Sequence, residues 1–426
     1  MASNRNQILE IQLEKLRELI DKCLESNPFW KTRLASIDWE TNLDSVESFC
    51  KALPLLNKNE LIEDQTSHPP YGTNFNYPLS KYCRLSQTSG TTGSPIRWLD
   101  TRHSWQRMIE GWKIVLEKSN FQAADRVIFP FSFGPFIGLW LAFEAAVQME
   151  CLVITGANLS SSMRLKMIQE HAITAICCTP TYAIRLGQIA KADGIDLAES
   201  SVKKIILAGE PGGSIPATRD LLLALWPNVQ IYDHHGMTEV GPVTYQCPKR
   251  WGRLHVIESQ FIPEIISKDS SLPVSPGEIG ELVLTTLDRD ASPLFRYQTG
   301  DLVKRSLGDR CECGTHELAF DGGILSRTDD MIIVRGVNIY PGAVESVIRR
   351  FEEIEEYQVK ITRESGMLKV GVEIELSSPA HSPEKMIQML EENFKSSLAI
   401  RIPVTLVPLD SLPRYELKSK RWLRYD

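Results

Sequence analysis

The chain has 426 residues, of which 42% are hydrophobic and 24% charged, and its net charge is -7 at pH 7. This length predicts two or three domains with a large buried core, and the composition is ordinary for a soluble globular protein. The acidic balance argues against broad nucleic-acid binding, which usually needs a basic surface.

The first predicted element is a helix over residues 8–24, where apolar residues recur at helical spacing. This start is amphipathic and differs from an apolar signal segment. The longest apolar stretch, 137–149, is short and carries Glu144, so we expect no membrane span. The nine cysteines are expected to be free thiols or metal ligands rather than disulfides, and the expected location is the cytoplasm.

Beyond residue 120, apolar strand-like runs alternate with helical runs. This alternation predicts a parallel sheet with crossover helices. The predicted strands are 126–129, 151–155, 174–178, 204–208 and 229–232, and the predicted helices between them are 163–171 and 217–226.

From about residue 254 to 304 the pattern becomes β-rich, with turns such as 275–277 between strands. The strands predicted there are 261–266, 281–285 and 301–305. After Arg327 the tail follows the order helix, strand, strand, helix, strand, over 341–351, 356–363, 368–376, 383–394 and 404–408. We therefore expect an α/β fold with a large N-terminal α/β domain, 1–328, and a small C-terminal α+β domain, 329–426.

The segment 86–95 contains two glycines and six hydroxyl side chains in ten residues. Glycine lets a ligand approach the backbone amides, and serine and threonine add hydroxyl donors beside them. The segment therefore predicts a cradle for an anion such as phosphate. It is not a Walker loop, because no Gly-Lys-Ser/Thr follows it. A surface loop rich in turn formers is the alternative.

Five later segments carry a more specific pattern. They are Ala-Gly-Glu-Pro at 208–211, Tyr-Asp-His-His-Gly-Met-Thr-Glu at 232–239, Arg-Tyr-Gln-Thr-Gly-Asp at 296–301, and the segments 326–338 and 413–421. With the phosphate loop, they follow the order and spacing of the adenylate-forming, or acyl-CoA synthetase, superfamily. The chain most resembles the phenylacetate-CoA ligase branch, in its short length as well, and the resemblance covers nearly the whole sequence.

The resemblance implies an ATP-dependent ligase that joins a carboxylic acid to CoA through an acyl-adenylate, with an aryl or arylacetic acid as substrate. It implies ATP, Mg²⁺ and CoA, or a phosphopantetheine thiol, as cofactors, and it leaves a homodimer open. One alternative is an adenylating enzyme that passes the acyl group to a carrier-protein thiol or an amine. Another is a non-catalytic nucleotide-binding scaffold, which the intact Thr238, Glu239 and Asp301 argue against.

Adenylation brings two anions together, so the site needs hydrogen-bond donors, a metal and a cation. The resemblance places Thr238 at the α-phosphate, Glu239 on Mg²⁺ and Asp301 on the ribose hydroxyls. Lys418 is the expected catalytic cation, but the family's Gly-Lys is Leu417-Lys418 here, so Lys420 is a rival. The expected nucleotide-binding residues are Ser89, Gly90, Thr91, Thr92, Gly93, Gly209, Glu210, Pro211, Asp233, His234, His235, Gly236, Asp301 and Arg327.

The resemblance also implies residues for the acyl pocket, for the hinge between the domains and for the CoA tunnel. The expected pocket residues are Phe131, Phe133, Gly134, Phe136, Ala208, His234 and Gly236. Their aromatic rings would suit a flat aryl acid, although plain core packing is an equal alternative. Asp329 matches the hinge about which the C-terminal domain rotates between half-reactions, and Gly336 matches a glycine lining the CoA tunnel. His235 stands where the family usually has an aromatic residue that stacks on adenine.

Cys247, His255, Cys311 and Cys313 form a second candidate site, because three thiolates and an imidazole suit tetrahedral Zn²⁺. Relatives in the phenylacetate-CoA ligase branch carry a similar pattern and bind zinc there. We therefore expect a structural zinc in a β-rich subdomain at about 245–325. The alternatives are free cysteines on β-hairpins, or His316 as a weaker candidate for the imidazole ligand.

Overall fold

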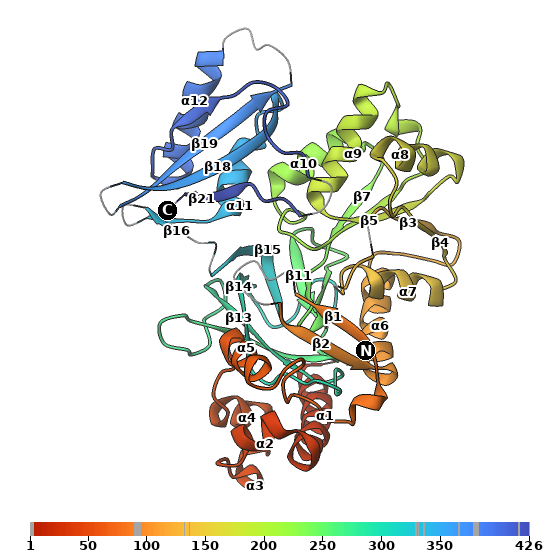
Figure 1. Ribbon diagram of the computed structural model, residues 1–426, viewed down its shortest axis with the longest axis vertical. Helices are drawn as coiled ribbons and strands as arrows, with labels where there is room; N and C mark the ends of the chain where they lie inside the picture. Colours follow the sequence, from red (N-terminus) through yellow and green to blue (C-terminus); the bar gives the residue numbers. More distant parts are fainter. Residues whose placement is uncertain are drawn as a thin grey trace.

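The computed structural model describes residues 4–88, 95–131, 133–135, 137–328, 330, 332–334, 337–364, 367–377, 383–415 and 418–425 (Figure 1). The chain begins with α1 (Arg5–Ser26), α2 (Pro28–Leu34), α3 (Trp39–Asn42), α4 (Val46–Ala52) and α5 (Lys58–Ser67). The helix predicted over 8–24 is confirmed within α1. That helix starts at the N-cap Asn4 and buries Leu16 and Ile20 against the core.

The predicted parallel sheet is confirmed, and its strand order is β4-β3-β5-β6-β7. The strands are β3 (Arg126–Phe129), β4 (Leu152–Thr155), β5 (Ala175–Cys178), β6 (Lys204–Leu207) and β7 (Gln230–Asp233). Each strand end lies within one residue of its predicted position. The central β5 is buried along its whole length, as expected for a parallel sheet covered by helices.

The helices around this sheet include two that the sequence predicts and several that it does not. They are α6 (Arg102–Lys118), α7 (Trp140–Gln148), α8 (Ser161–Glu170), α9 (Pro180–Ala192), the short η2 (Leu197–Glu199) and α10 (Pro216–Leu225). The ranges predicted at 163–171 and 217–226 correspond to α8 and α10. The helix α9 was missed because most of its residues are buried, so it lacks a one-sided apolar pattern.

The β-rich region forms an antiparallel sheet in the order β10-β11-β15-β14-β13-β12. Its strands are β10 (Thr244–Gln246), β11 (Arg253–Val256), β12 (Phe261–Ile266), β13 (Ile279–Thr286), β14 (Tyr297–Arg305) and β15 (Ala319–Arg327). Smaller antiparallel pairs join β1 (Tyr82–Gln87), which follows η1 (Leu79–Lys81), to β2 (Arg97–Thr101), and β8 (Gly236–Met237) to β9 (Gly241–Pro242). The predicted change from a parallel to a β-rich architecture is confirmed.

The last hundred or so residues have a hydrophobic core of their own, which runs from Ile332 to Val404 with Trp422 against it. The elements are β16 (Ile332–Val334), β17 (Val337–Ile339), α11 (Pro341–Ile348), β18 (Ile354–Glu364), β19 (Met367–Leu376), α12 (Pro383–Leu398), β20 (Val404–Leu406) and β21 (Trp422–Tyr425). The predicted order from α11 to β20 is confirmed. The strand β21 was missed, because its sequence reads as a charged chain end.

The strand β21 adds to the edge of the C-terminal sheet, whose order is β20-β19-β18-β21. It runs parallel to β18, with Trp422 opposite Val359. In Figure 1 these blue elements lie at the upper left, beside α10 and above β15. This pairing fixes the chain from Arg421 onward, three residues after Lys418. None of the described helices combines the length and apolar character that crossing a bilayer requires.

Candidate active site

The parallel sheet brings two of the predicted motifs to one edge. Gly209 and Glu210 follow the end of β6, and His234 and His235 follow the end of β7. The strands are in register, with Leu207 opposite Asp233, and the His234 amide donates to the carbonyl of Leu207 at 3.0 Å. The carboxyl ends of adjacent parallel strands are a common place for ligands.

Some predicted residues lie outside the described part of the chain. They are Ser89, Gly90, Thr91, Thr92 and Gly93 of the phosphate loop, Phe136 of the acyl pocket, the hinge Asp329 and the tunnel residue Gly336. Their roles remain predictions from the resemblance.

Asp301 of β14 meets His235 at the edge of the parallel sheet. Asp301 Oδ2 lies 3.2 Å from His235 Nε2, and Asp301 Oδ1 accepts a hydrogen bond from Arg327 Nη1 at 3.1 Å. Burial alone would raise the pKa of Asp301, but the neighbouring His235 and Arg327 hold it below its ordinary value. An ionised carboxylate is therefore held inside the protein.

The contact between Asp301 Oδ2 and His235 Nε2 is close but lacks hydrogen-bond geometry. Both atoms are buried, and within the described residues neither has a hydrogen-bond partner. Buried polar atoms are nearly always paired, so an unpaired carboxylate oxygen indicates that a donor is missing. The hydroxyls of a ribose would supply such donors, and the nucleotide expected from the sequence fits this site.

A buried ion pair anchors the turn that carries Thr238 and Glu239. Arg289 donates to the Thr238 carbonyl at 2.6 Å and to both carboxylate oxygens of Asp100 at 2.9 and 2.6 Å. The side chains of Arg289 and Asp100 are almost completely buried. The sequence did not predict this pair, because Asp100 lies within β2 and Arg289 lies 189 residues away without a recognisable motif.

Glu239 is buried, and its Oε1 lies 3.6 Å from Lys58 Nζ at the start of α5. Within the described residues no group donates a hydrogen bond to this carboxylate. A buried carboxylate that accepts no hydrogen bond from the described residues suits Mg²⁺, a hard cation that prefers oxygen ligands. The donor chemistry of Glu239 therefore fits the magnesium site expected from the sequence.

Lys418 enters the site from the C-terminal part of the chain. Its side chain lies against Gly209, where an added β-carbon would be 3.4 Å from Lys418 Cε. Surrounding protein atoms lower the pKa of Lys418, although Glu210, Glu239 and Asp301 act in the opposite direction. Lys418 is exposed as a whole residue, and its ammonium group lies in the field of three carboxylates.

The rival Lys420 lies differently. Its carbonyl accepts a hydrogen bond from the Tyr415 hydroxyl at 2.8 Å, and none of the described contacts joins its side chain to the site. The geometry thus favours Lys418 as the lysine that serves this site.

Two clusters of packed rings lie among the residues of the candidate acyl pocket. Phe133 lies 4.6 Å from Phe131 and 4.2 Å from Trp140 between ring centroids. His234 packs at 4.1 Å on Trp112 of α6, which sequence analysis missed. Phe131 is itself part of the main hydrophobic core, so the rings serve packing whether or not they also contact a substrate.

His234 is a neutral imidazole with a fixed orientation. Its Nδ1 lies 2.6 Å from the Thr244 carbonyl, which can only accept, so Nδ1 carries the proton. Burial lowers the pKa of His234 to about 3. Next to it, a β-carbon on Gly236 would lie 2.9 Å from the Gly241 carbonyl and 3.1 Å from His234 Nε2, so only glycine fits there without rearrangement.

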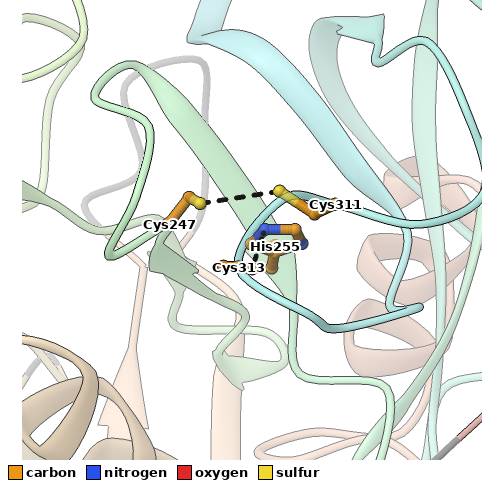
Figure 2. A group of neighbouring side chains, drawn as sticks. All are labelled: Cys247, His255, Cys311 and Cys313. Atoms are coloured by element: carbon orange, nitrogen blue, oxygen red, sulfur yellow. Dashed lines mark hydrogen bonds between the residues drawn. The ribbon is translucent and has the colours of Figure 1, made fainter.

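The cysteine and histidine residues of the predicted metal site lie together (Figure 2). Cys247 follows β10, His255 lies on β11, and Cys311 and Cys313 lie between β14 and β15. The Sγ atoms of Cys247 and Cys311 are 3.6 Å apart, and Cys313 Sγ lies 3.5 Å from His255 Nε2. All four potential ligand atoms lie within 4.8 Å of one another.

Comparison with known proteins identifies the family. A family model described as AMP-binding enzyme matches residues 59–286, which is more than half of the chain. The chain belongs to the AMP-binding enzyme family. A second model, described as AMP-binding enzyme C-terminal domain, matches residues 336–424. The superfamily resemblance predicted from the motifs is thereby confirmed.

Individual relatives cover nearly the whole chain. Phenylacetate-coenzyme A ligase of Thermus thermophilus is 28% identical over an alignment of 435 positions, gaps included. The alignment covers 97% of this chain and 95% of that protein. The structure of 2-hydroxyisobutyryl-CoA ligase in its postadenylation state is 23% identical and gives a TM-score of 0.92, covering 99% of this chain and 90% of that one. The structure of the same ligase in its thioesterification state is 24% identical and gives a TM-score of 0.73, again covering 99% of this chain and 90% of that one. The overall arrangement here is therefore closer to the postadenylation structure.

The buried carboxyl group of Asp233 makes stability depend on pH. It accepts a hydrogen bond from Ser214, but burial raises its pKa to about 6. The folded state therefore binds this proton more tightly than the unfolded chain, whose aspartate pKa is about 3.9. Stability from this group is present below about pH 4 and is lost as pH rises through about 6.

Asp233→Asn should remove that loss. The wild type should lose about 2 to 3 kcal/mol of unfolding free energy between pH 4 and pH 7 that the variant does not lose. This is the expected size, because one pKa unit corresponds to about 1.4 kcal/mol. Denaturant titrations at several pH values would measure this shift. Asp269→Asn, at an exposed turn, is the control. A difference between Asp233→Asn and wild type that stays constant with pH would contradict the assignment.

Proposed function

We propose that this chain is an AMP-forming carboxylic acid–CoA ligase that works through an acyl-adenylate. The observation that carries the proposal is the meeting of Lys418, Glu239 and Asp301 at one edge of the parallel sheet, although they come from separate elements. The nearly full-length similarity to phenylacetate-coenzyme A ligases supports the same activity. The non-catalytic scaffold is disfavoured, because a scaffold has no need of a cation enclosed by these carboxylates.

The reaction consists of two substitutions. First, a carboxylate oxygen of the acid attacks the α-phosphorus of ATP and pyrophosphate leaves, which gives the acyl-adenylate. Then the thiolate of CoA attacks the acyl carbon and AMP leaves with the original carboxylate oxygen. Charge accumulates at phosphorus in the first step, so preorganised cations and donors lower its barrier.

Each residue has one proposed task. Asp301 would accept hydrogen bonds from the ribose hydroxyls, and His235 would lie against the same nucleoside. Glu239 would hold Mg²⁺, which offsets phosphate charge when bound. Thr238 would donate to the α-phosphate, and Lys418 would bridge the acid and the phosphate oxygens. Gly209 leaves the space that the lysine occupies.

We propose an aryl or arylacetic acid as the substrate. The rings of Phe131, Phe133 and Trp112, together with the phenylacetate-coenzyme A ligases among the relatives, support an aromatic acid. A carrier-protein thiol or an amine as the acyl acceptor is the second candidate. A cytoplasmic location, a division into domains at 328/329 and a homodimer remain expectations.

We also propose a structural zinc held by Cys247, His255, Cys311 and Cys313. Zinc binds sulfur at about 2.3 Å and imidazole nitrogen at about 2.0 Å, so tetrahedral ligands lie roughly 3.8 Å apart for two sulfurs and roughly 3.5 Å for sulfur and nitrogen. The distances of 3.6 and 3.5 Å in this cluster are close to both values. His255 Nδ1 lies 3.4 Å from the Glu317 carbonyl, which leaves Nε2 facing Cys313.

Pyrophosphate exchange tests the proposed activity. Phenylacetate and substituted aryl acids should promote exchange of labelled pyrophosphate into ATP, and added CoA should yield AMP and acyl-CoA. Glu239→Gln should lower the exchange by at least roughly 100-fold, the cost of losing a strong electrostatic stabiliser. No exchange with any acid would favour the scaffold. Exchange without consumption of CoA would favour another acceptor.

Two lysine variants test which residue provides the cation. Lys418→Ala should reduce acid-dependent exchange by at least roughly 100-fold, yet it should leave transfer from supplied acyl-adenylate to CoA largely intact. Lys420→Ala should stay close to the wild type in both assays. If exchange fails in Lys420→Ala and survives in Lys418→Ala, the assignment of the lysine is wrong by two positions.

Metal analysis tests the zinc site. Protein purified without chelator should contain about one zinc per chain. Cys311→Ser should lower both zinc content and melting temperature, because metal binding is coupled to folding. Cys83→Ser, which changes an exposed free cysteine, is the matched control. Zinc-free wild-type protein, or Cys311→Ser protein that retains its zinc, would overturn the proposal.

A further inference from the structure

We propose that Glu210 is a positioning residue for adenylation, and that it acts by holding the chain segment that carries Lys418. The inference rests on the proposed function and deepens it. The family resemblance predicts that Glu210 binds the nucleotide. In the structure, both oxygens of its carboxylate accept hydrogen bonds from the protein.

One carboxylate oxygen of Glu210 binds the N-terminal part of the chain, and the other binds the C-terminal part. Oε1 accepts from the backbone amide of Thr181 at 2.9 Å. Oε2 accepts from the backbone amide of Ser419 at 2.8 Å and from its hydroxyl at 3.1 Å. Since Ser419 follows Lys418 directly, these bonds fix the peptide unit that joins them.

The surroundings of Glu210 strengthen these hydrogen bonds. Thr181 lies in the first turn of α9, where the positive end of the helix dipole stabilises a carboxylate. Hydrogen bonds to a charged acceptor are about twice as strong as neutral ones. The pairing therefore fixes the backbone of Ser419 against a rigid element of the N-terminal part.

Arg421, two residues after Ser419, makes a second contact with the same helix. Arg421 Nη1 donates to the Thr181 hydroxyl at 3.2 Å, while the rest of its guanidinium donates to both oxygens of Glu356 at 2.6 and 3.1 Å. Arg421 and Glu356 are buried. The segment from Ser419 to Arg421 is thus docked on α9, and Lys418 projects from its end toward Gly209.

This arrangement implies a role in one half-reaction only. The bonds exist in the arrangement that resembles the postadenylation structure, and the thioesterification structure fits this chain less well. Any rotation of the C-terminal part that withdraws Lys418 must break both bonds from Ser419. Glu210 should therefore support formation of the acyl-adenylate and contribute little to its reaction with CoA.

The test compares Glu210→Gln with the wild type in both half-reactions. Glutamine offers one oxygen to two backbone amides, so one amide loses its partner. Acid-dependent pyrophosphate exchange should fall roughly 10- to 100-fold, the effect of losing a hydrogen bond to a charged group. Transfer from supplied acyl-adenylate to CoA should stay within about twofold of wild type, since it uses none of these bonds. Glu355→Gln is the matched control, because Glu355 pairs with Arg185 at 3.9 Å between the same two parts but away from Lys418.

Hydrogen exchange supplies a readout that does not depend on activity. Peptides covering 418–425 should exchange faster in Glu210→Gln than in the wild type or in Glu355→Gln. Unchanged pyrophosphate exchange, or equal losses in both half-reactions, would overturn the inference. Lost adenylation with unchanged hydrogen exchange would show that Glu210 acts on the nucleotide directly, and would overturn it too. A wild type without pyrophosphate exchange would refute the proposed function instead, while the hydrogen-exchange comparison would still test the contact.

Discussion

The candidate site depends on the docking of one short segment, Ser419 to Arg421, on the start of α9. Glu210, Thr181 and Glu356 hold that segment through hydrogen bonds to charged groups. An ammonium group surrounded by protein is costly unless opposite charges surround it. At Lys418 the carboxylates of Glu210, Glu239 and Asp301 offset part of that cost, although burial still lowers the pKa of the lysine. The docking of the segment and the electrostatics of the site therefore depend on each other.

The N-terminal part provides fixed positions for the other groups. Glu210 and His235 follow the ends of the paired strands β6 and β7, and the antiparallel sheet brings Asp301 and Arg327 opposite each other in register. Arg289 and Asp100 fix the carbonyl of Thr238. Asp301 Oδ2 and His235 Nε2, which have no hydrogen-bond partner among the described residues, lie where a nucleoside is expected. Rigid support with unpaired atoms at its centre is the property expected of a preorganised binding site.

Much of this architecture could be predicted from the sequence, because local patterns determine it. Alternation of apolar strands and helices predicted the parallel sheet, and the family resemblance of the motif at 232–239 predicted nucleotide-binding roles for its residues. The sequence could not reveal the Arg289–Asp100 pair or the bonds from Glu210 to Ser419, since these join residues about 200 positions apart in no recurring pattern. The grouping of Cys247, His255, Cys311 and Cys313 was predicted from the close Cys311–Cys313 pair and from the family resemblance. Trp112, in contrast, appears as an ordinary helical core residue.

The central claim is that a carboxylic acid is activated as its adenylate, and oxygen labelling tests it most directly. The acid would carry ¹⁸O in its carboxylate, and the AMP and acyl-CoA formed from ATP and CoA would be analysed by mass spectrometry. Attack of the carboxylate on the α-phosphorus predicts one ¹⁸O atom in every AMP phosphate. Formation of ADP and phosphate, or of AMP without the label, would contradict the account.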